Sequence, residues 1–284
     1  MSEQLNQLIR QTTELPSMPE VAFEVMRVAD MADSSAITVA ATLSRDPSLS
    51  VRILRLANSA FYGMTREVTS ISDAVVVLGM RTVKSLSLVA ASFPWLHKAL
   101  DGKGISPVLL WNHSLTTAYL VRAMATRKRM PDAELPFCIG LLHDIGTVVF
   151  AVWKENAFES LVRRAEAEER PLDEIERAVY GFDHAEVGAE LCDVWNLPKV
   201  YGSAIRYHHQ PNLPETSDPI ADLIHVADFM VRERGINEGA FGQIYQLDQE
   251  AFERVGLTMD ELNEMLDTAI NQGTDLQTTE RKAA

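Results

Sequence analysis

Cysteine is scarce in this sequence, whose 284 residues include only Cys138 and Cys192. Two distant cysteines, each in an apolar helical context, provide neither a disulfide framework nor a C-x-x-C metal motif. We therefore expect both to be small core residues rather than nucleophiles, in a protein that folds in a reducing compartment.

Targeting and membrane segments are missing as well. The first twenty residues lack the basic start and apolar core of a signal peptide, and we expect no run approaching the ~20 apolar residues that a membrane-spanning helix needs. The sequence therefore predicts a cytoplasmic protein that makes no membrane contact.

Positive charge is under-represented, with 26 Lys and Arg against 40 Asp and Glu and a formal net charge of −14 at pH 7. Such a field repels phosphate backbones, so nucleic-acid binding would need a segregated basic patch. The compact candidate, Arg122 to Arg129, is better interpreted as the basic end of a helix. A nucleic-acid partner is not expected.

Several enzyme signatures have no match in the chain. There is no G-x-S-x-G elbow, no P-loop, and no G-x-G-x-x-G motif following a strand. These absences leave no support for a nucleophilic hydrolase or a nucleotide-binding α/β enzyme.

Helical periodicity is what the sequence does have. Apolar residues recur at three- and four-residue spacing almost throughout, as at Val21, Val25 and Val28, whereas strict alternation is scarce. Helix boundaries are marked by Pro47 after Asp46 and by Gly79 after an apolar run. The sequence predicts an all-α protein.

A stretch rich in glycine and proline, Leu100 to Pro107, interrupts two strongly helical regions. We place a boundary there. The predicted organisation is an N-terminal helical subdomain at 1–100 packed on a helical bundle at 101–272, followed by a disordered tail at 273–284.

Histidine and aspartate residues recur in the predicted bundle, on or at the ends of helices and among apolar neighbours. A helical bundle can aim one such side chain from each of several helices at a shared interior point. Asp228 lies one turn after Ile224 and is expected to face the core, where a carboxylate needs a cationic or hydrogen-bonding partner. The candidate ligands are His113, His143, Asp144, His184, His208, His209 and Asp228.

Mixed nitrogen and oxygen ligands suit iron, manganese, zinc or nickel better than calcium or magnesium. We expect one or two divalent transition-metal ions, with a purely hydrogen-bonded polar core as the alternative. His97 and His225 are interpreted as ordinary residues.

The order of these residues resembles the HD superfamily of metal-dependent phosphohydrolases. The stretches "LSRDPSLSVRILRLANSAFYG", "VTSISDAVVVLGM", "GLLHDIG" and "HAEVGAELCDVWNLP" are similar to those of the HDOD family, a branch of the HD/HD-GYP superfamily formed by HD-related output domains of bacterial signalling proteins. The resemblance implies an HD-like bundle and a regulatory role, exerted through protein–protein contacts and without established catalysis. Because no room remains for a receiver domain, the module is expected to stand alone.

Two departures from the catalytic HD-GYP branch favour this non-enzymatic function. That branch usually has a lysine after "HDIG", where this chain has Thr147, and a Gly-Tyr-Pro signature where this chain reads "QPNLPETSDP" after His209. A phosphoryl-transfer site without such a cation loses transition-state stabilisation. The alternative function is a metal-dependent phosphohydrolase acting on a nucleotide or cyclic dinucleotide.

The segment after the helix that contains Leu49 and Ile53 offers no recognisable chemistry. We hypothesise that Phe61 or Tyr62 anchors a protein partner there. The alternative is that Asn58 merely holds the turn by hydrogen-bonding the backbone.

Overall fold

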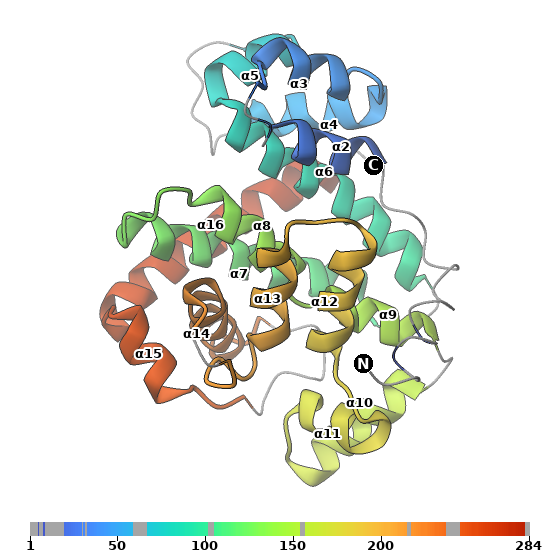
Figure 1. The fold of residues 1–284 in the computed structure, drawn as a ribbon, viewed down its shortest axis with the longest axis vertical. Coiled ribbons are helices and arrows are strands. Elements are labelled where there is room, and N and C mark those ends of the chain that lie inside the picture. The colour runs from blue at the N-terminus through green and yellow to red at the C-terminus, as the bar shows by residue number, and fades with distance from the viewer. Residues whose placement is uncertain are drawn as a thin grey trace. The chain divides into compact units, whose positions relative to one another are not determined.

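In the computed structural model, the described residues are 5, 8, 20–29, 31, 33–58, 67–101, 105–153, 157–214, 217–236 and 245–281. Within these ranges the regular structure is entirely α-helical, which confirms the all-α prediction (Figure 1). The helices are α2 (Glu20–Ala29), α3 (Ala36–Leu43), α4 (Pro47–Ala57), α5 (Ile71–Leu78), α6 (Met80–Leu100), α7 (Pro107–Arg127), α8 (Glu134–Leu142), α9 (Ile145–Trp153), α10 (Ala157–Glu168), α11 (Leu172–Tyr180), α12 (His184–Val194), α13 (Lys199–Tyr207), α14 (Pro219–Glu233), α15 (Gln249–Val255) and α16 (Met259–Arg281).

The helices form two compact units. The bundle unit contains the described residues from Leu96 to Ala269 together with Leu5 and Leu8, and the N-terminal unit contains the described residues from 17 to 95 and those from Ile270 onward. The division between Trp95 and Leu96 falls inside α6. Helix α16 continues to Arg281, within the range for which the sequence predicts a disordered tail.

Helix ends in the N-terminal unit follow from local hydrogen bonds. Asp46 Oδ1 accepts a hydrogen bond from Leu49 N at 3.0 Å, next to Pro47 at the start of α4. Ser70 caps α5 in the same way, and Gly79 ends that helix with φ of 84°. The buried Ile53 lies in the core of this unit, as predicted.

Asn58 joins the end of α4 to the chain ten residues later. Its Nδ2 donates to Leu54 O at 2.9 Å and to Val68 O at 2.8 Å, while its Oδ1 accepts from Val68 N at 2.8 Å. The turn-holding role considered for Asn58 is therefore confirmed. Phe61 and Tyr62, the hypothesised partner anchors, lie outside the described residues.

Helix α7 occupies the middle of the bundle unit and is buried along most of its length. It packs against α8 and α14, while α12 packs against both α13 and α9 (Figure 1). Large side chains fill this core, including Trp111, Tyr119 and Phe137. Both cysteines are buried without a disulfide, and burial raises the pKa of the Cys192 thiol to about 12, in agreement with a core role.

One segment contradicts the expectation that no apolar run is long enough to cross a membrane. By length and composition Glu134–Trp153 qualifies, but 89% of its apolar window is buried inside the protein. The segment is also broken into α8 and α9 by a turn at His143 and Asp144. Such burial is typical of the core of a soluble protein, and the cytoplasmic location stays a prediction.

The basic stretch at the end of α7 is engaged within the bundle unit. Arg127 pairs with Glu261 at 2.6 Å, and Lys128 Nζ donates to the backbone carbonyls of Arg254 and Val255. These cations therefore fasten α7 to the α15–α16 region of the same unit.

We predict that Asn58→Ala lowers the free energy of unfolding by about 1–2 kcal/mol, because it removes three hydrogen bonds that tie Val68 and Leu54 together. Urea denaturation of the full chain measures this difference. The control is Glu67→Ala at the exposed neighbouring position, which should change stability by less than ~0.5 kcal/mol. Equal effects of the two substitutions would contradict the assigned role.

Candidate metal centre

All seven predicted ligand residues come together inside the bundle unit. His113 lies on α7, His143 and Asp144 form the turn between α8 and α9, and His184 begins α12. His208 and His209 follow α13, and Asp228 lies on α14. Six of the seven side chains are buried and His209 is half-buried. Residues from six helices or helix ends therefore meet at one interior point, as the sequence predicts.

The first of two groups, here called the first cage, consists of His113, His143, Asp228 and the Oδ2 atom of Asp144. His113 Nε2 lies 3.3 Å from His143 Nε2, 3.0 Å from Asp228 Oδ1 and 3.3 Å from Asp144 Oδ2. His143 Nε2 lies 3.1 Å from Asp144 Oδ2. Four tetrahedral ligands at ~2.1 Å from an ion lie about 3.4 Å from one another. The first cage thus has the dimensions of a metal site.

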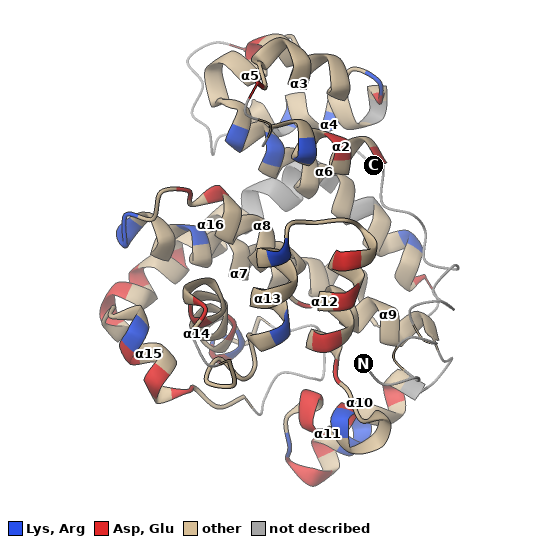
Figure 2. Ribbon diagram, viewed as in Figure 1, with Lys and Arg blue, Asp and Glu red and all other residues tan. Residues whose placement is uncertain are grey.

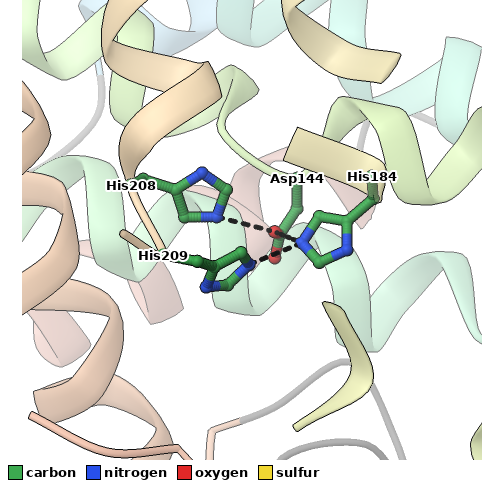
Figure 3. A group of neighbouring side chains, drawn as sticks. All are labelled: Asp144, His184, His208 and His209. Atoms are coloured by element: carbon green, nitrogen blue, oxygen red, sulfur yellow. Dashed lines mark hydrogen bonds and ion pairs between the residues drawn. The ribbon is translucent and has the colours of Figure 1, made fainter. Parts of the chain in front are cut away.

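The second cage consists of His184, His208, His209 and the Oδ1 atom of Asp144 (Figure 3). Asp144 Oδ1 lies 3.5 Å from His184 Nε2 and 3.7 Å from His208 Nε2, and His209 Nε2 lies 2.7 Å from His184 Nε2. The ligand atoms of this group all lie within 4.8 Å of one another. Asp144 therefore offers one oxygen to each cage, the arrangement of a bridging carboxylate.

The histidine tautomers leave lone pairs facing the cages. Nδ1 of His113 lies 3.0 Å from Ile236 O, Nδ1 of His143 lies 2.7 Å from Gly140 O, and Nδ1 of His208 lies 2.6 Å from Ile205 O. A carbonyl oxygen only accepts hydrogen bonds, so each of these Nδ1 atoms carries the proton. In the neutral ring Nε2 is then unprotonated, which is the form that binds a metal.

The pKa values of the three histidines in the second cage are shifted in different directions. Burial lowers the pKa of His208 to about 3, and burial together with His208 and His184 holds the pKa of His209 well below its usual value. Burial alone would lower the pKa of His184 too, but the carboxylates of Glu176 and Asp144 outweigh it and raise that pKa well above its usual value. The carboxylates of Glu176 and Asp144 therefore favour the protonated form of His184.

One buried atom tests whether these residues fit a metal ion. Among the described residues, His208 Nε2 has no hydrogen-bond donor, although the residue is 0% exposed. An unsatisfied buried acceptor costs free energy. A divalent ion between this atom, Asp144 and His184 would satisfy it, so the donor set fits a transition metal.

Sequence reasoning missed three residues at the centre. Glu176 of α11 is completely buried, and its Oε2 accepts from both His184 Nδ1 and His184 N, at 2.7 and 2.8 Å. Tyr245 has its hydroxyl 3.1 Å from His209 Nδ1. Arg232 of α14 pairs with Asp228 and Asp144. For Arg232 the i,i+4 spacing from Asp228 was a usable signal, because both positions share a helix face.

His225, interpreted as an ordinary residue, supports the centre without joining a cage. Its Nδ1 lies 2.8 Å from His208 O, and its Nε2 accepts from Asp248 N at 2.8 Å. The ring therefore ties the start of α15 to the backbone of a predicted ligand. His97 is exposed and lies outside both cages.

Two glycines allow the elements around Asp144 to approach closely. A Cβ atom on Gly146, at the start of α9, would lie 1.9 Å from His184 O and 2.8 Å from Gly188 N. A Cβ atom added to Gly188 would lie 3.3 Å from Gly146 N. Only glycine at 146 permits this contact of α9 with α12, and the contact brings His184 to Asp144.

Comparisons with known proteins agree with this geometry. A family model of the HDOD domain matches residues 15–211, a range that ends before Asp228. An HDOD domain protein of unknown function from Geobacter sulfurreducens superposes with a TM-score of 0.81 at 24% identity, covering 97% of this chain and 98% of that one. A candidate phosphohydrolase from Shewanella amazonensis has a TM-score of 0.77 at 26% identity, covering 96% and 97%.

An uncharacterised protein of Treponema pallidum (strain Nichols) is 31% identical over 226 residues, which are 77% of this chain and 42% of the relative. The chain thus spans less than half the length of this curated relative. The helical fold and the histidine–aspartate centre define a protein of the HD-like class. Within that class, the match over residues 15–211 shows that the chain belongs to the HDOD family.

We predict that Gly146→Ala destabilises the protein by about 3 kcal/mol or more, because the added methyl group would overlap the His184 carbonyl. Gly202→Ala is the matched control, since its Cβ would lie 3.3 Å from the nearest atom, and it should change stability by about 1 kcal/mol at most. Thermal unfolding of both variants provides the measurement. A Gly146→Ala variant as stable as the control would show that α9 and α12 do not require this contact.

Proposed function

We propose that this chain is a regulatory signalling module that acts by contacting another protein through its N-terminal unit, with the histidine–aspartate centre holding metal rather than hydrolysing substrate. The observation that carries the proposal is an exposed, nearly uncharged apolar surface on α3 and α5. Ile37 of α3 is 81% exposed and Val76 of α5 is 73% exposed. These two helices pack against each other within the N-terminal unit.

The composition of the two helices supports this contact. Helix α3 has no charged residue and α5 has only Asp73, so both ribbons are almost uniformly tan in Figure 2. Val77 of α5 is also exposed. Apolar side chains held in water by neighbouring helices are typical of protein interaction sites, because burying them against a partner is favourable.

The metal part of the proposal rests on the two cages. The residues that would hold metal are those of the first cage, the second cage, or both, and their mixed nitrogen and oxygen atoms suit iron, manganese, zinc or nickel. A bound ion would neutralise the buried carboxylates and polarise a ligand placed on an open coordination position. The chain's own contribution is to orient each ring through its Nδ1 hydrogen bond.

The environment of Asp144 argues against phosphate hydrolysis. Thr147, where the catalytic HD-GYP branch usually has a lysine, is neutral and buried at 3% exposure. The guanidinium of Arg232, which reaches Asp144, is paired with two carboxylates instead of being open to a phosphate. A developing negative charge on a transferred phosphoryl group would have little stabilisation here.

A second candidate, a metal-dependent phosphohydrolase acting on a nucleotide or cyclic dinucleotide, is favoured by one observation. Asp144 is shared by two cages, each of which could hold an ion. Enzymes that cleave phosphoesters use such a pair of neighbouring ions to bind the attacking and leaving oxygens. The similar Shewanella amazonensis protein is a candidate phosphohydrolase. Assays of the purified protein with cyclic dinucleotides and bis(p-nitrophenyl) phosphate, in Mn²⁺, Fe²⁺ or Zn²⁺, separate the two functions.

We predict that Asp144→Ala lowers metal affinity more than about 100-fold, because the substitution removes an oxygen from each cage. Metal analysis by mass spectrometry after dialysis measures the loss. His97→Ala, at an exposed position outside both cages, is the control and should retain wild-type metal content. A wild-type protein that neither contains nor takes up metal would instead support a hydrogen-bonded polar core.

We predict that Val76→Asp and Ile37→Asp abolish capture of partner protein from a lysate of the cells that encode this chain, without changing metal content or melting temperature. A charge at a contact surface must be desolvated on binding, whereas in the free protein it stays in water. The matched control is Val194→Asp on α12, where the native side chain is 56% exposed in the bundle unit. Loss of capture only in the Val194 or Asp144 variants would assign the contact to the bundle unit.

A further inference from the structure

Arg232 is a buried cation placed between the two carboxylates of the first cage. It lies on α14 one turn after Asp228, with its side chain 8% exposed. Its Nε donates to Asp228 Oδ1 at 2.7 Å, and its Nη2 lies 3.4 Å from Asp144 Oδ2. The guanidinium also lies over the ring of Tyr245, 5.5 Å from the centroid, where a cation–π contact holds it in place.

The oxygens that Arg232 contacts are those that face the histidines of the first cage. Asp228 Oδ1 lies 3.0 Å from His113 Nε2, and Asp144 Oδ2 lies 3.3 Å from the same nitrogen. Asp228 Oδ2, by contrast, has no hydrogen-bond partner among the described residues. A residue that orients a metal-binding carboxylate from outside would bind the oxygen turned away from the ligands. Arg232 instead uses the oxygens that an ion in the first cage would use.

Arg232 and a metal ion would compete for these carboxylate oxygens, because both are positively charged. A guanidinium stays protonated at any pH at which the protein is folded, so the first cage permanently contains one positive charge beside its two carboxylates. A divalent ion coordinated by Asp228 Oδ1 would lie within a few ångströms of that charge, in an interior where repulsion is poorly screened. The second cage is less affected, because among the described residues Arg232 has no polar contact with Asp144 Oδ1 or with the three histidines, although its charge still acts on His209.

We propose that Arg232 is the built-in cation of the first cage, so that the chain binds one divalent ion, in the second cage, and excludes a second ion. The inference rests on the metal occupancy in the proposed function and deepens it. A single ion cannot form the paired clamp used in two-metal phosphoester cleavage, which gives a physical reason for a module without hydrolysis.

The test is the stoichiometry of Mn²⁺ binding to the full chain, measured by equilibrium dialysis with metal analysis and by electron paramagnetic resonance. The wild type should bind one tight Mn²⁺ and give the spectrum of an isolated ion. Arg232→Gln should bind a second Mn²⁺ at least about tenfold more tightly than the wild type does, because the repelling charge is gone. Two adjacent ions should then give an exchange-coupled spectrum.

Two further variants separate charge from shape. Arg232→Lys retains the positive charge and should bind one ion, as the wild type does. The control is Arg234→Gln, which removes an exposed guanidinium that pairs with Asp267. This variant should also bind one ion. Circular dichroism confirms that each variant is folded.

Each outcome decides the inference. Two ions in the wild type would overturn it even if Arg232→Gln failed to fold, and so would a folded Arg232→Gln variant that bound one ion or none. In both cases the proposed metal centre would survive, because the wild type would still bind Mn²⁺. A wild type that bound no ion would show that the metal centre itself, and with it this inference, is wrong.

Discussion

The burial of the Asp144 carboxylate imposes the strongest constraint on the bundle unit. The residue is 2% exposed, in a turn between two apolar helices, and an isolated charge there would be costly. Its two oxygens are therefore surrounded by nitrogen atoms from α7, α12, α14 and the end of α13. The helices must therefore pack so that their polar side chains reach the two oxygens of this carboxylate.

The surroundings of the centre are organised to hold its rings rather than to expose them. Backbone carbonyls fix three imidazoles through Nδ1, and the buried Glu176 fixes a fourth. Polar groups arranged in this way add specificity to a core that apolar packing alone would leave tolerant of rearrangement. They also direct each Nε2 atom inward, which is a prerequisite for binding a metal.

The N-terminal unit differs from the bundle unit in what it buries and what it exposes. Its core contains ordinary apolar residues such as Leu43 and Ile53, and the metal-ligand groups found among the described residues all lie in the bundle unit. Among its described residues, local polar interactions include the caps of α3 and α5 and the Asn58 contacts with Val68.

The sequence by itself determined the helical class and the identities of the seven clustered residues, because helix periodicity and caps are local properties and because imidazole or carboxylate in an apolar run needs an explanation. It also indicated that Asp228 faces the core. Only the tertiary structure decided that Asp144 serves both cages and that Glu176 and Arg232 belong to the centre. On its own helix Glu176 looks like an ordinary surface charge, and for Arg232 the i,i+4 spacing indicates a pair with Asp228 but not a contact with Asp144. Arg232 meets Asp144 across 88 positions of the chain, and no local pattern specifies a contact made only when distant helices pack.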